Sequence, residues 1–249
     1  MQQPGRHLRQ IRGLAACLLI STLPALISTA QSRDNSTADS AWQDLLADNS
    51  LTAWRNYRSD EISAGWQIEN GILYRSGKRA GDLITRAQFA DFELELEWRV
   101  ETGGNSGIFF RATEDHRYIF MSAPEVQILD DNHHKDGRST LTSAGANYGL
   151  HPAPRGIVRS AGAWNTVRVR VVGDSVTQWL NDQQIVSYQL NSEDWQRRVD
   201  NSKFRRWPDY GKARRGHIGL QDHGDPVAFR NIRVRPIAPN SVAPPVITP

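Results

Sequence analysis

Apolar and polar residues alternate with a period of two in several segments of the chain. The clearest is Phe92–Val100, where five apolar side chains alternate with three glutamates and one arginine. The pattern recurs in Val167–Val171 and Val227–Val234, and Val176–Leu190 has the form of a hairpin that turns at Asn181-Asp182. Because successive side chains of a β-strand point to opposite faces, each segment is predicted to be a strand with one buried face.

Turn and helix signals complete the prediction of the fold. Asn70-Gly71 separates Trp66–Glu69 from Ile72–Arg75, and Asn-Gly between two apolar runs is a strong signal for a β-hairpin. Helix-like patterns are confined to Ala41–Ala47 and Ser192–Phe204. Many short antiparallel strands with so little helix predict an all-β jelly-roll sandwich of two antiparallel sheets with one short helix.

Three predicted strands carry polar side chains in the phase that does not face the core. They are Gly103–Arg111, Pro124–Asp130 and Gly216–Gly224. The side chains in this phase include Arg111, Glu125, Gln127, His217, Gln221 and His223. The glycine-rich start of the first segment precedes a strand rather than a helix, so it does not indicate a phosphate loop. Three such faces suit a polyhydroxylated ligand better than a hydride or phosphate donor.

The order of motifs resembles the 3-keto-disaccharide hydrolase domain family. The resemblance covers roughly Trp42 to Ile237. It is carried by Leu51–Trp54, Gly104–Arg111, Glu125–Asp130, Gly145–Gly149, Trp164-Asn165, Ser202–Phe204, Gly216–Gly224 and Phe229–Ile232. Several motifs in one order make a specific signal. The chain departs from the family pattern at Asn147 and at Asn181-Asp182, where the family usually has an Asn-Gly turn.

The resemblance implies a concanavalin-like fold whose concave sheet faces sugars, and an activity on 3-keto-glycosides. On this hypothesis Glu125 and His223 are the catalytic base and acid, in either order. Arg111 and Gln127 are assigned to bind the ketone and hydroxyl groups, and Asn105, Tyr148 and Gln221 to orient the sugar. The sequence requires no cofactor, although a divalent cation at the ketone would also serve and no ligand set for one is evident.

Each candidate also has a structural explanation. Glu93, Glu95 and Glu97 on one strand face are typical of a solvated surface. Glu125 can form an ion pair with Arg111, and His223 can bond into the following loop. The rival function is a non-catalytic carbohydrate-binding jelly roll, for which the same polar face would serve.

Two other chemistries are weakly supported by the residues present. Retaining jelly-roll hydrolases place acids at fixed steps along one strand, but here Gln127 stands at the middle position and Asp130 falls on the opposite face. His133-His134, beside Asp130-Asp131 and Asp136, can ligate a metal. Their spacing fits no standard zinc pattern, and a flexible polar loop is the alternative.

The first thirty residues have the features of a secretory signal peptide. Residues 1–12 carry three arginines and no acid, an apolar run follows, and Ser28–Ala30 offers small residues for cleavage. Cys17 follows Leu14-Ala15-Ala16 as in a lipoprotein box, but most of the apolar run lies after it. We therefore expect a periplasmic or secreted protein, cleaved after Ala30, with no stable membrane span.

The remaining chain is electrically balanced and free of cysteine. Because residues 1–30 hold three of the 30 basic residues and the only cysteine, 27 basic and 27 acidic side chains remain. This balance gives no electrostatic support to a nucleic-acid partner. We expect a polar linker at 31–41, a domain at 42–237 and a Pro-rich tail at 238–249, with a sugar or 3-keto-glycoside as the ligand.

Overall fold

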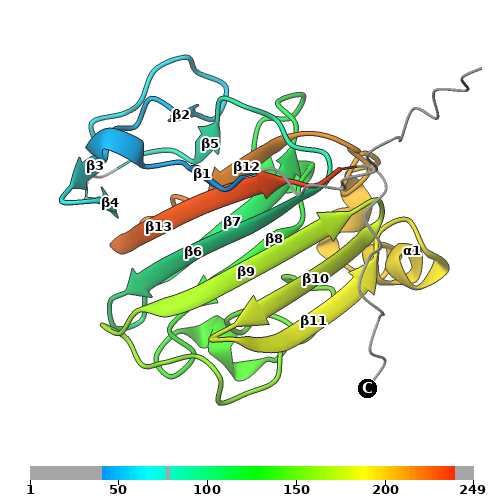
Figure 1. Ribbon diagram of the computed structural model, residues 1–249. Helices are drawn as coiled ribbons and strands as arrows, with labels where there is room; N and C mark the ends of the chain where they lie inside the picture. The colour runs from blue at the N-terminus through cyan, green and yellow to red at the C-terminus, as the bar shows by residue number, and fades with distance from the viewer. Residues whose placement is uncertain (1–40, 77–78, 239–249) are drawn as a thin grey trace, which may run out of the picture. The chain divides into compact units, whose positions relative to one another are not determined.

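The computed structural model describes residues 41–76 and 79–238, which form two antiparallel β-sheets and one short α-helix (Figure 1). The strands of the larger sheet are β1 (Gln43–Asp44), β3 (Trp66–Glu69), β4 (Ile72–Arg75), β6 (Phe92–Val100), β9 (Asn165–Val172), β10 (Ser175–Leu180), β11 (Gln183–Gln189) and β13 (Val227–Pro236). The strands of the smaller sheet are β2 (Trp54–Asn56), β5 (Leu83–Thr85), β7 (Asn105–Ala112), β8 (Glu125–Leu129) and β12 (His217–Leu220). The predicted jelly-roll sandwich is confirmed.

The larger sheet has the strand order β11-β10-β9-β6-β13-β4-β3, with β1 added beside β13. The hairpin predicted at Asn70-Gly71 joins β3 to β4, and the one predicted at Asn181-Asp182 joins β10 to β11. The smaller sheet, in the order β2-β5-β12-β7-β8, lies behind the larger one in Figure 1. Apolar side chains from the facing surfaces of both sheets form one continuous core.

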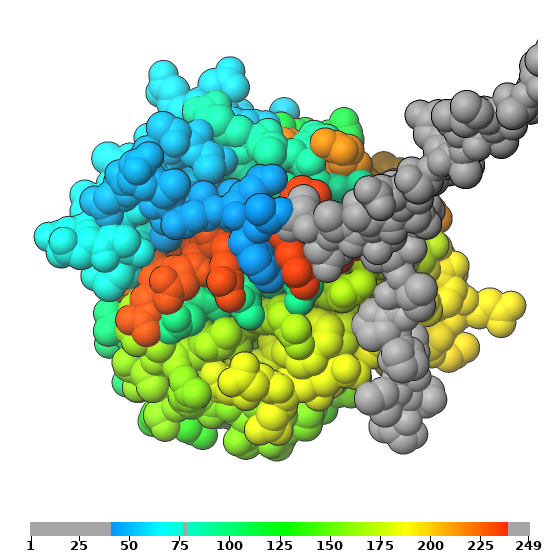
Figure 2. Space-filling model, viewed as in Figure 1, coloured from blue at the N-terminus to red at the C-terminus, as the bar shows by residue number. Residues whose placement is uncertain are grey.

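A ladder of ion pairs covers the outer face of the larger sheet, which Figure 2 shows in space-filling form. Glu93, Glu95 and Glu97 on β6 pair with arginines of the neighbouring β13, and Glu93 also pairs with Arg168 on β9. Paired opposite charges on adjacent strands stabilise a sheet surface. Glu95 and Glu97 are partly exposed, in keeping with a surface role, whereas Glu93 is buried between its two arginine partners. Trp164 lies partly exposed under the guanidinium groups of Arg99 and Arg230 rather than in the core.

Helix α1 (Glu193–Asp200) is the single α-helix of the described residues, and it begins where the sequence predicts. Ser192 caps it by accepting a hydrogen bond from the Trp195 amide, which satisfies one free donor of the first turn. The 3-10 helices are η1 (Ala47–Asn49), η2 (Ile119–Met121), η3 (Lys135–Arg138) and η4 (Lys203–Arg206). The turn expected near 41–47 lies later in the chain: Gln43-Asp44 pairs with β13, and a turn at 45–46 leads into η1.

The outer face of the smaller sheet is divided into two parts. One part is an apolar cluster beneath η2 that includes Phe109, Ile119 and Ala123. The other part carries polar side chains from β7, β8 and the residues after β12. No helix of the described residues is both long and apolar enough to cross a membrane.

A buried ion pair holds the segment that follows β12. Arg75 on β4 donates to the Asp222 carboxylate at 2.6 Å, and both side chains are less than a tenth exposed. Asp222 also accepts a hydrogen bond from the Gly81 amide at 2.7 Å. The pair therefore ties β4, the strand next to the edge of the larger sheet, to Gln221 and His223, the two residues on either side of Asp222.

Asp222→Asn is expected to destabilise the protein because it leaves the buried Arg75 guanidinium without its counter-charge. Breaking a buried pair in this way costs about 3–5 kcal/mol, which denaturant unfolding monitored by tryptophan fluorescence will measure. Arg214→Ala, which breaks the more exposed pair with Asp174, is the control and should cost no more than ~1 kcal/mol. Equal costs for the two variants would contradict the structural role assigned to Asp222.

Candidate functional site

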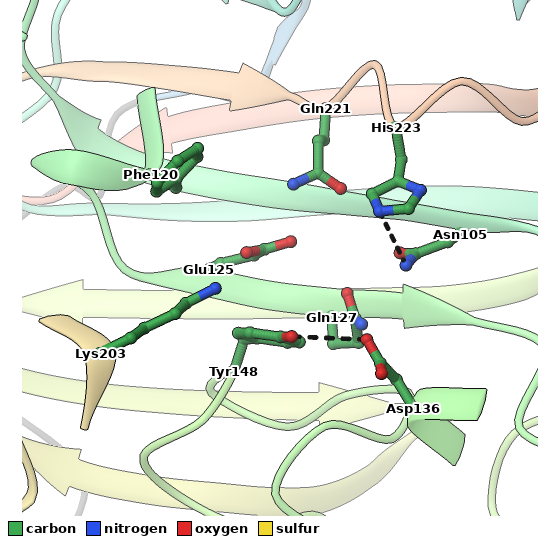
Figure 3. A pocket seen from close by; sticks show the side chains of 9 residues that line it. All are labelled: Asn105, Phe120, Glu125, Gln127, Asp136, Tyr148, Lys203, Gln221 and His223. Atoms are coloured by element: carbon green, nitrogen blue, oxygen red, sulfur yellow. Dashed lines mark hydrogen bonds between the residues drawn. The ribbon is translucent and has the colours of Figure 1, made fainter. Parts of the chain in front are cut away.

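A cavity of about 180 Å³ lies on the polar part of the smaller sheet's outer face (Figure 3). The residues that line it are Asn105, Phe120, Glu125, Gln127, Asp136, Tyr148, Lys203, Gln221 and His223. Six of the seven residues assigned to the site from sequence therefore line one cavity, and Arg111 is the exception. A concave site with a few convergent polar groups is typical of a small-molecule binding site.

Gly107 sets the position of the Glu125 carboxyl group. The two residues lie on adjacent strands, where Gly107 pairs with Gln127 and Phe109 pairs with Glu125. A Cβ atom at Gly107 would come within 2.2 Å of a Glu125 carboxyl oxygen. Only glycine lets this carboxyl group lie flat against the sheet, which gives a physical reason for the glycine that ends Gly104–Gly107.

The segment Ser143–Tyr148 extends the smaller sheet beyond β8 and delivers Tyr148 to the cavity. The backbone N–H of Gln127 donates to the backbone carbonyl of Ala146 at 3.0 Å. The backbone N–H of Tyr148 donates to the backbone carbonyl of Glu125 at 2.9 Å. The Tyr148 hydroxyl reaches Asp136 on η3 at 3.4 Å (Figure 3). The backbone of β8 thus fixes the phenol beside the carboxyl group.

Gln221 and His223 reach the cavity from the segment after β12. The backbone N–H of Gln221 donates to the Gly107 carbonyl at 2.9 Å, and the Gln221 side chain lies opposite Glu125 (Figure 3). The His223 ring lies 3.4 Å from the Asn105 side-chain amide and 3.4 Å from Asp225. Because His223 is also partly exposed, it lies at the mouth of the cavity rather than at its base.

Burial dominates the electrostatics of Glu125. Burial, together with the negative charges of Asp82 and Asp136, raises the pKa of this carboxyl group to about 8. The Lys203 ammonium and a hydrogen bond from Gln221 lower the pKa but only partly offset the burial. Burial also raises the pKa of Tyr148 to about 12. Near neutral pH the site therefore holds a carboxyl group poised between its acid and base forms.

Three buried amide oxygens at the cavity have no hydrogen-bond donor among the described residues. They are Asn105 Oδ1, Gln127 Oε1 and Gln221 Oε1. Buried polar groups without partners are rare in folded proteins and carry a free-energy cost. Sugar hydroxyl groups are suitable donors for all three, so the arrangement favours a ligand that presents several hydroxyl groups around one ring.

Arg111 does not enter the cavity, contrary to prediction. Its guanidinium donates to the Ala90 carbonyl at 2.9 Å and pairs with Asp91 at 3.0 Å. The cause is a β-bulge: β7 uses three residue steps where β12 uses two, and Arg111 has a φ of 51°. A bulge changes the phase of the strand and redirects its side chain. The alternative of an ion pair between Glu125 and Arg111 is not found either.

Lys203 enters the cavity although no role was predicted for it. Its motif, Ser202–Phe204, is part of the family resemblance, but it lies on η4, far from the polar strands in sequence. The residue as a whole is exposed, but its ammonium end lies in the cavity and points toward Glu125 (Figure 3). Period-two analysis of strands gives no signal for a residue that reaches a sheet from outside.

The loop around His133 and His134 is occupied by structural contacts. Asp130 accepts hydrogen bonds from the Gly103 amide at 2.9 Å and from His133 at 2.7 Å. The His134 ring packs edge-on against that of His223, with centroids 6.2 Å apart. Within residues 41–76 and 79–238 no three His, Cys, Asp or Glu side chains are grouped as metal ligands. A cation at the ketone therefore stays a prediction.

A larger hollow of about 570 Å³ lies on the outer face of the larger sheet. Its lining includes Trp42, Glu95, Glu97 and Arg233. The two glutamates and Arg233 belong to the ladder of ion pairs, so their charges are already balanced. The smaller cavity, with its unpartnered amides and buried carboxyl group, is the better candidate for a functional site.

Fold and cavity together define a two-sheet jelly roll with a small polar site on its smaller sheet. A candidate glycosyl hydrolase from Parabacteroides distasonis has a similar solved structure, with a TM-score of 0.73, 27% identity, and coverage of 79% of this chain and 94% of that one. A galectin-like protein of unknown function from Bacillus subtilis shares the fold, with a TM-score of 0.52, 13% identity, and coverage of 78% of this chain and 94% of that one.

The chain belongs to the 3-keto-alpha-glucoside-1,2-lyase-like domain family, whose model matches residues 41–235. A relative from Bacteroides thetaiotaomicron, a 3-keto-disaccharide hydrolase, is 35% identical over 216 residues. The match covers 74% of this chain and 74% of the relative. The family resemblance carried by the motifs is thereby confirmed.

Glu125→Gln is expected to raise the melting temperature by an amount that grows with pH. The unfolded carboxyl group ionises near 4.5, whereas burial holds the folded pKa near 8. Between these values ionisation stabilises the unfolded state, so the wild-type protein loses stability that the glutamine variant keeps. Each 1 kcal/mol of difference corresponds to roughly 2–4 °C in Tm for a protein of this size.

Calorimetry at pH 4, 6 and 8 checks this expectation, with Glu61→Gln as a control at an exposed carboxylate. The difference from wild type should be small at pH 4 and largest at pH 8. A difference that stays constant over this range would show that Glu125 ionises normally in the folded protein.

Proposed function

We propose that this protein is an exported enzyme that cleaves 3-keto-glycosides. The observation that carries the proposal is the Glu125 carboxyl group, buried beneath Gln221 in a cavity with three unpartnered amide oxygens. Membership of the lyase-like family and the name of the Bacteroides relative support this substrate class. The apolar, arginine-led start of the chain supports export.

The chemistry of a 3-keto sugar matches a site with one tunable carboxyl group. The ketone at carbon 3 acidifies the proton on carbon 2, and a base removes it. The electron pair forms an enolate, which then expels the oxygen on carbon 1 and leaves an enone. Addition of water to the enone completes a net hydrolysis. This route needs a base, an acid for the leaving oxygen, and an electrophile for the ketone.

The residues of the cavity supply two of these three groups. Glu125 is the base, because a carboxyl pKa near 8 makes its carboxylate a stronger proton acceptor than an ordinary glutamate. His223, at the mouth, is placed to protonate the leaving oxygen as it departs toward solvent. Asn105, Gln127 and Gln221 hold the sugar hydroxyl groups, and the Tyr148 ring borders the sugar face. Arg111, first considered for the ketone, lies elsewhere.

A non-catalytic sugar-binding function is the second candidate, and the same amides would serve it. Burial of an ionisable carboxyl group, however, costs folding stability and adds nothing that a glutamine would not supply to a binding site. Incubation of the purified protein with a 3-keto-glucoside and with the corresponding glucoside separates the two functions. We expect release of the leaving group from the first only, and NMR of the products shows whether enone or hydrated sugar is released.

Glu125→Gln is expected to lower turnover of the 3-keto-glucoside by about 100- to 10,000-fold, because it removes the base but keeps the shape of the site. Binding, measured by calorimetric titration, should change little. His223→Ala should also lower kcat, and the loss should be smaller for a substrate with a good leaving group that needs no protonation. Unchanged turnover in both variants would favour the binding function.

The dependence of kcat/KM on pH is expected to distinguish a base from an acid at Glu125. If the carboxylate abstracts the proton, activity rises with pH through the raised pKa, near 8. The charged or ionisable groups around it are Lys203, Asp82, Asp136, Tyr148 and Tyr210. The rising limb should be absent in Glu125→Gln. A limb that falls through this range would assign Glu125 as the acid.

A further inference from the structure

The cavity contains one lysine, and its backbone is firmly held. Ser202 accepts a hydrogen bond from the Phe204 amide at 3.1 Å and donates to the Val199 carbonyl at 2.8 Å. Phe204 is buried and stacks on Tyr210 with ring centroids 4.1 Å apart. The residues on both sides of Lys203 are therefore anchored, so η4 presents the lysine in a defined position.

Aromatic rings surround the Lys203 ammonium. It lies 4.4 Å from the centre of the Tyr148 ring, 5.1 Å from that of Phe204 and 5.6 Å from that of Phe120. Cation–π contacts of this kind hold an ammonium without using its N–H groups in conventional hydrogen bonds. Among the described residues no hydrogen bond or ion pair within 4 Å occupies these donors, so they are available to a ligand.

The position of the ammonium relative to Glu125 matches the geometry of a 3-keto sugar. Figure 3 shows Nζ directed toward the Glu125 carboxyl group along one side of the cavity. The proton on carbon 2 and the oxygen on carbon 3 are on adjacent atoms, so a base and an electrophile must act at neighbouring points. Lys203 is also the one lysine or arginine among the lining residues.

We propose that Lys203 is the electrophile of the reaction: its ammonium donates a hydrogen bond to the carbon 3 oxygen and stabilises the enolate. This inference rests on the proposed function. When Glu125 takes the proton from carbon 2, the C–H electron pair becomes the new double bond between carbons 2 and 3. The carbonyl pair moves onto the oxygen that faces Lys203. Collapse of this enolate then breaks the bond between carbon 1 and the leaving oxygen.

Burial and a fixed position both strengthen this role. Burial lowers the pKa of Lys203, which makes the ammonium a stronger hydrogen-bond donor. An electrophile that is already in place when charge develops also needs no reorganisation during the reaction. The Lys203 ammonium also lowers the pKa of Glu125 and so favours its carboxylate form, which is the base. The same ammonium would stabilise the enolate that forms when the proton is transferred.

A substrate analogue without a leaving group isolates this step. 1,5-Anhydro-3-keto-glucitol has the ketone and the acidic proton on carbon 2 but no exocyclic leaving group on carbon 1. Exchange of this proton with D₂O, resolved by NMR from exchange at carbon 4, therefore reports enolate formation without loss of an aglycone. NMR follows this exchange with wild-type protein, Lys203→Met, Lys203→Arg and the control Lys212→Met, at an exposed lysine away from the cavity. We expect Lys203→Met to lower exchange ~100- to 1,000-fold, Lys203→Arg to recover part of it and Lys212→Met to change nothing.

A second readout separates this role from a structural one. Loss of the cation in Lys203→Met should move the rising limb of the pH profile to higher pH, whereas Lys203→Arg should leave it near its wild-type position. The losses should appear in kcat more than in KM, as expected for an interaction made in the transition state. Circular dichroism and melting curves confirm that each variant is folded.

Three outcomes would overturn the inference. Wild-type exchange in a folded Lys203→Met variant would show that another group stabilises the enolate. A covalent adduct at Lys203, trapped with cyanoborohydride and found by peptide mass, would replace the hydrogen bond with an imine. If wild-type protein exchanges no proton, the proposed function fails together with the inference, whereas the first two outcomes leave the proposed function intact.

Discussion

The contact between the Glu125 carboxyl group and Gly107 is the constraint on which the site depends. A side chain at position 107 would occupy the space that the carboxyl group fills. The carboxyl group in turn is flanked by Gln221, which hydrogen-bonds through its backbone to Gly107, and by Tyr148, which hydrogen-bonds through its backbone to Glu125. Strands or strand extensions from three parts of the chain therefore surround the Glu125 carboxyl group, which explains its burial and its raised pKa.

The two sheets divide structural and chemical tasks between them. The larger sheet balances its outer charges internally, through the glutamates of β6 and the arginines of β13. The smaller sheet instead leaves amide oxygens unpartnered and buries an ionisable carboxyl group. Such features cost stability, and the core between the sheets is large enough to support them. The buried ion pair of Arg75 and Asp222 links the segment that carries Gln221 and His223 to the larger sheet.

Period-two patterns predicted the sandwich and most of the site because strands convert sequence spacing directly into direction. Glu125, Gln127 and Gln221 were assigned to the outer face from this rule alone, and all three line the cavity. The rule failed at Arg111, since a one-residue bulge inverts the phase of the strand and has no clear local signature in sequence. The period-two rule makes no prediction for Lys203, because this residue lies on a 3-10 helix and reaches the sheet through a tertiary contact.

The cavity contains Lys203 and not the predicted Arg111, and this difference changes the chemistry expected of the site. An arginine at the ketone would be a rigid, permanently charged fork, suited to anions that are already formed. A lysine held by aromatic rings is a compact donor whose acidity responds to burial and to the charge of its neighbour. Glu125 and Lys203 each titrate in a direction set by desolvation, and each partly opposes that effect in the other. In the proposed reaction, a ketone beside both would accept the hydrogen bond of Lys203 as the neighbouring carbon loses its proton to Glu125, so proton transfer and charge stabilisation would take place in one site.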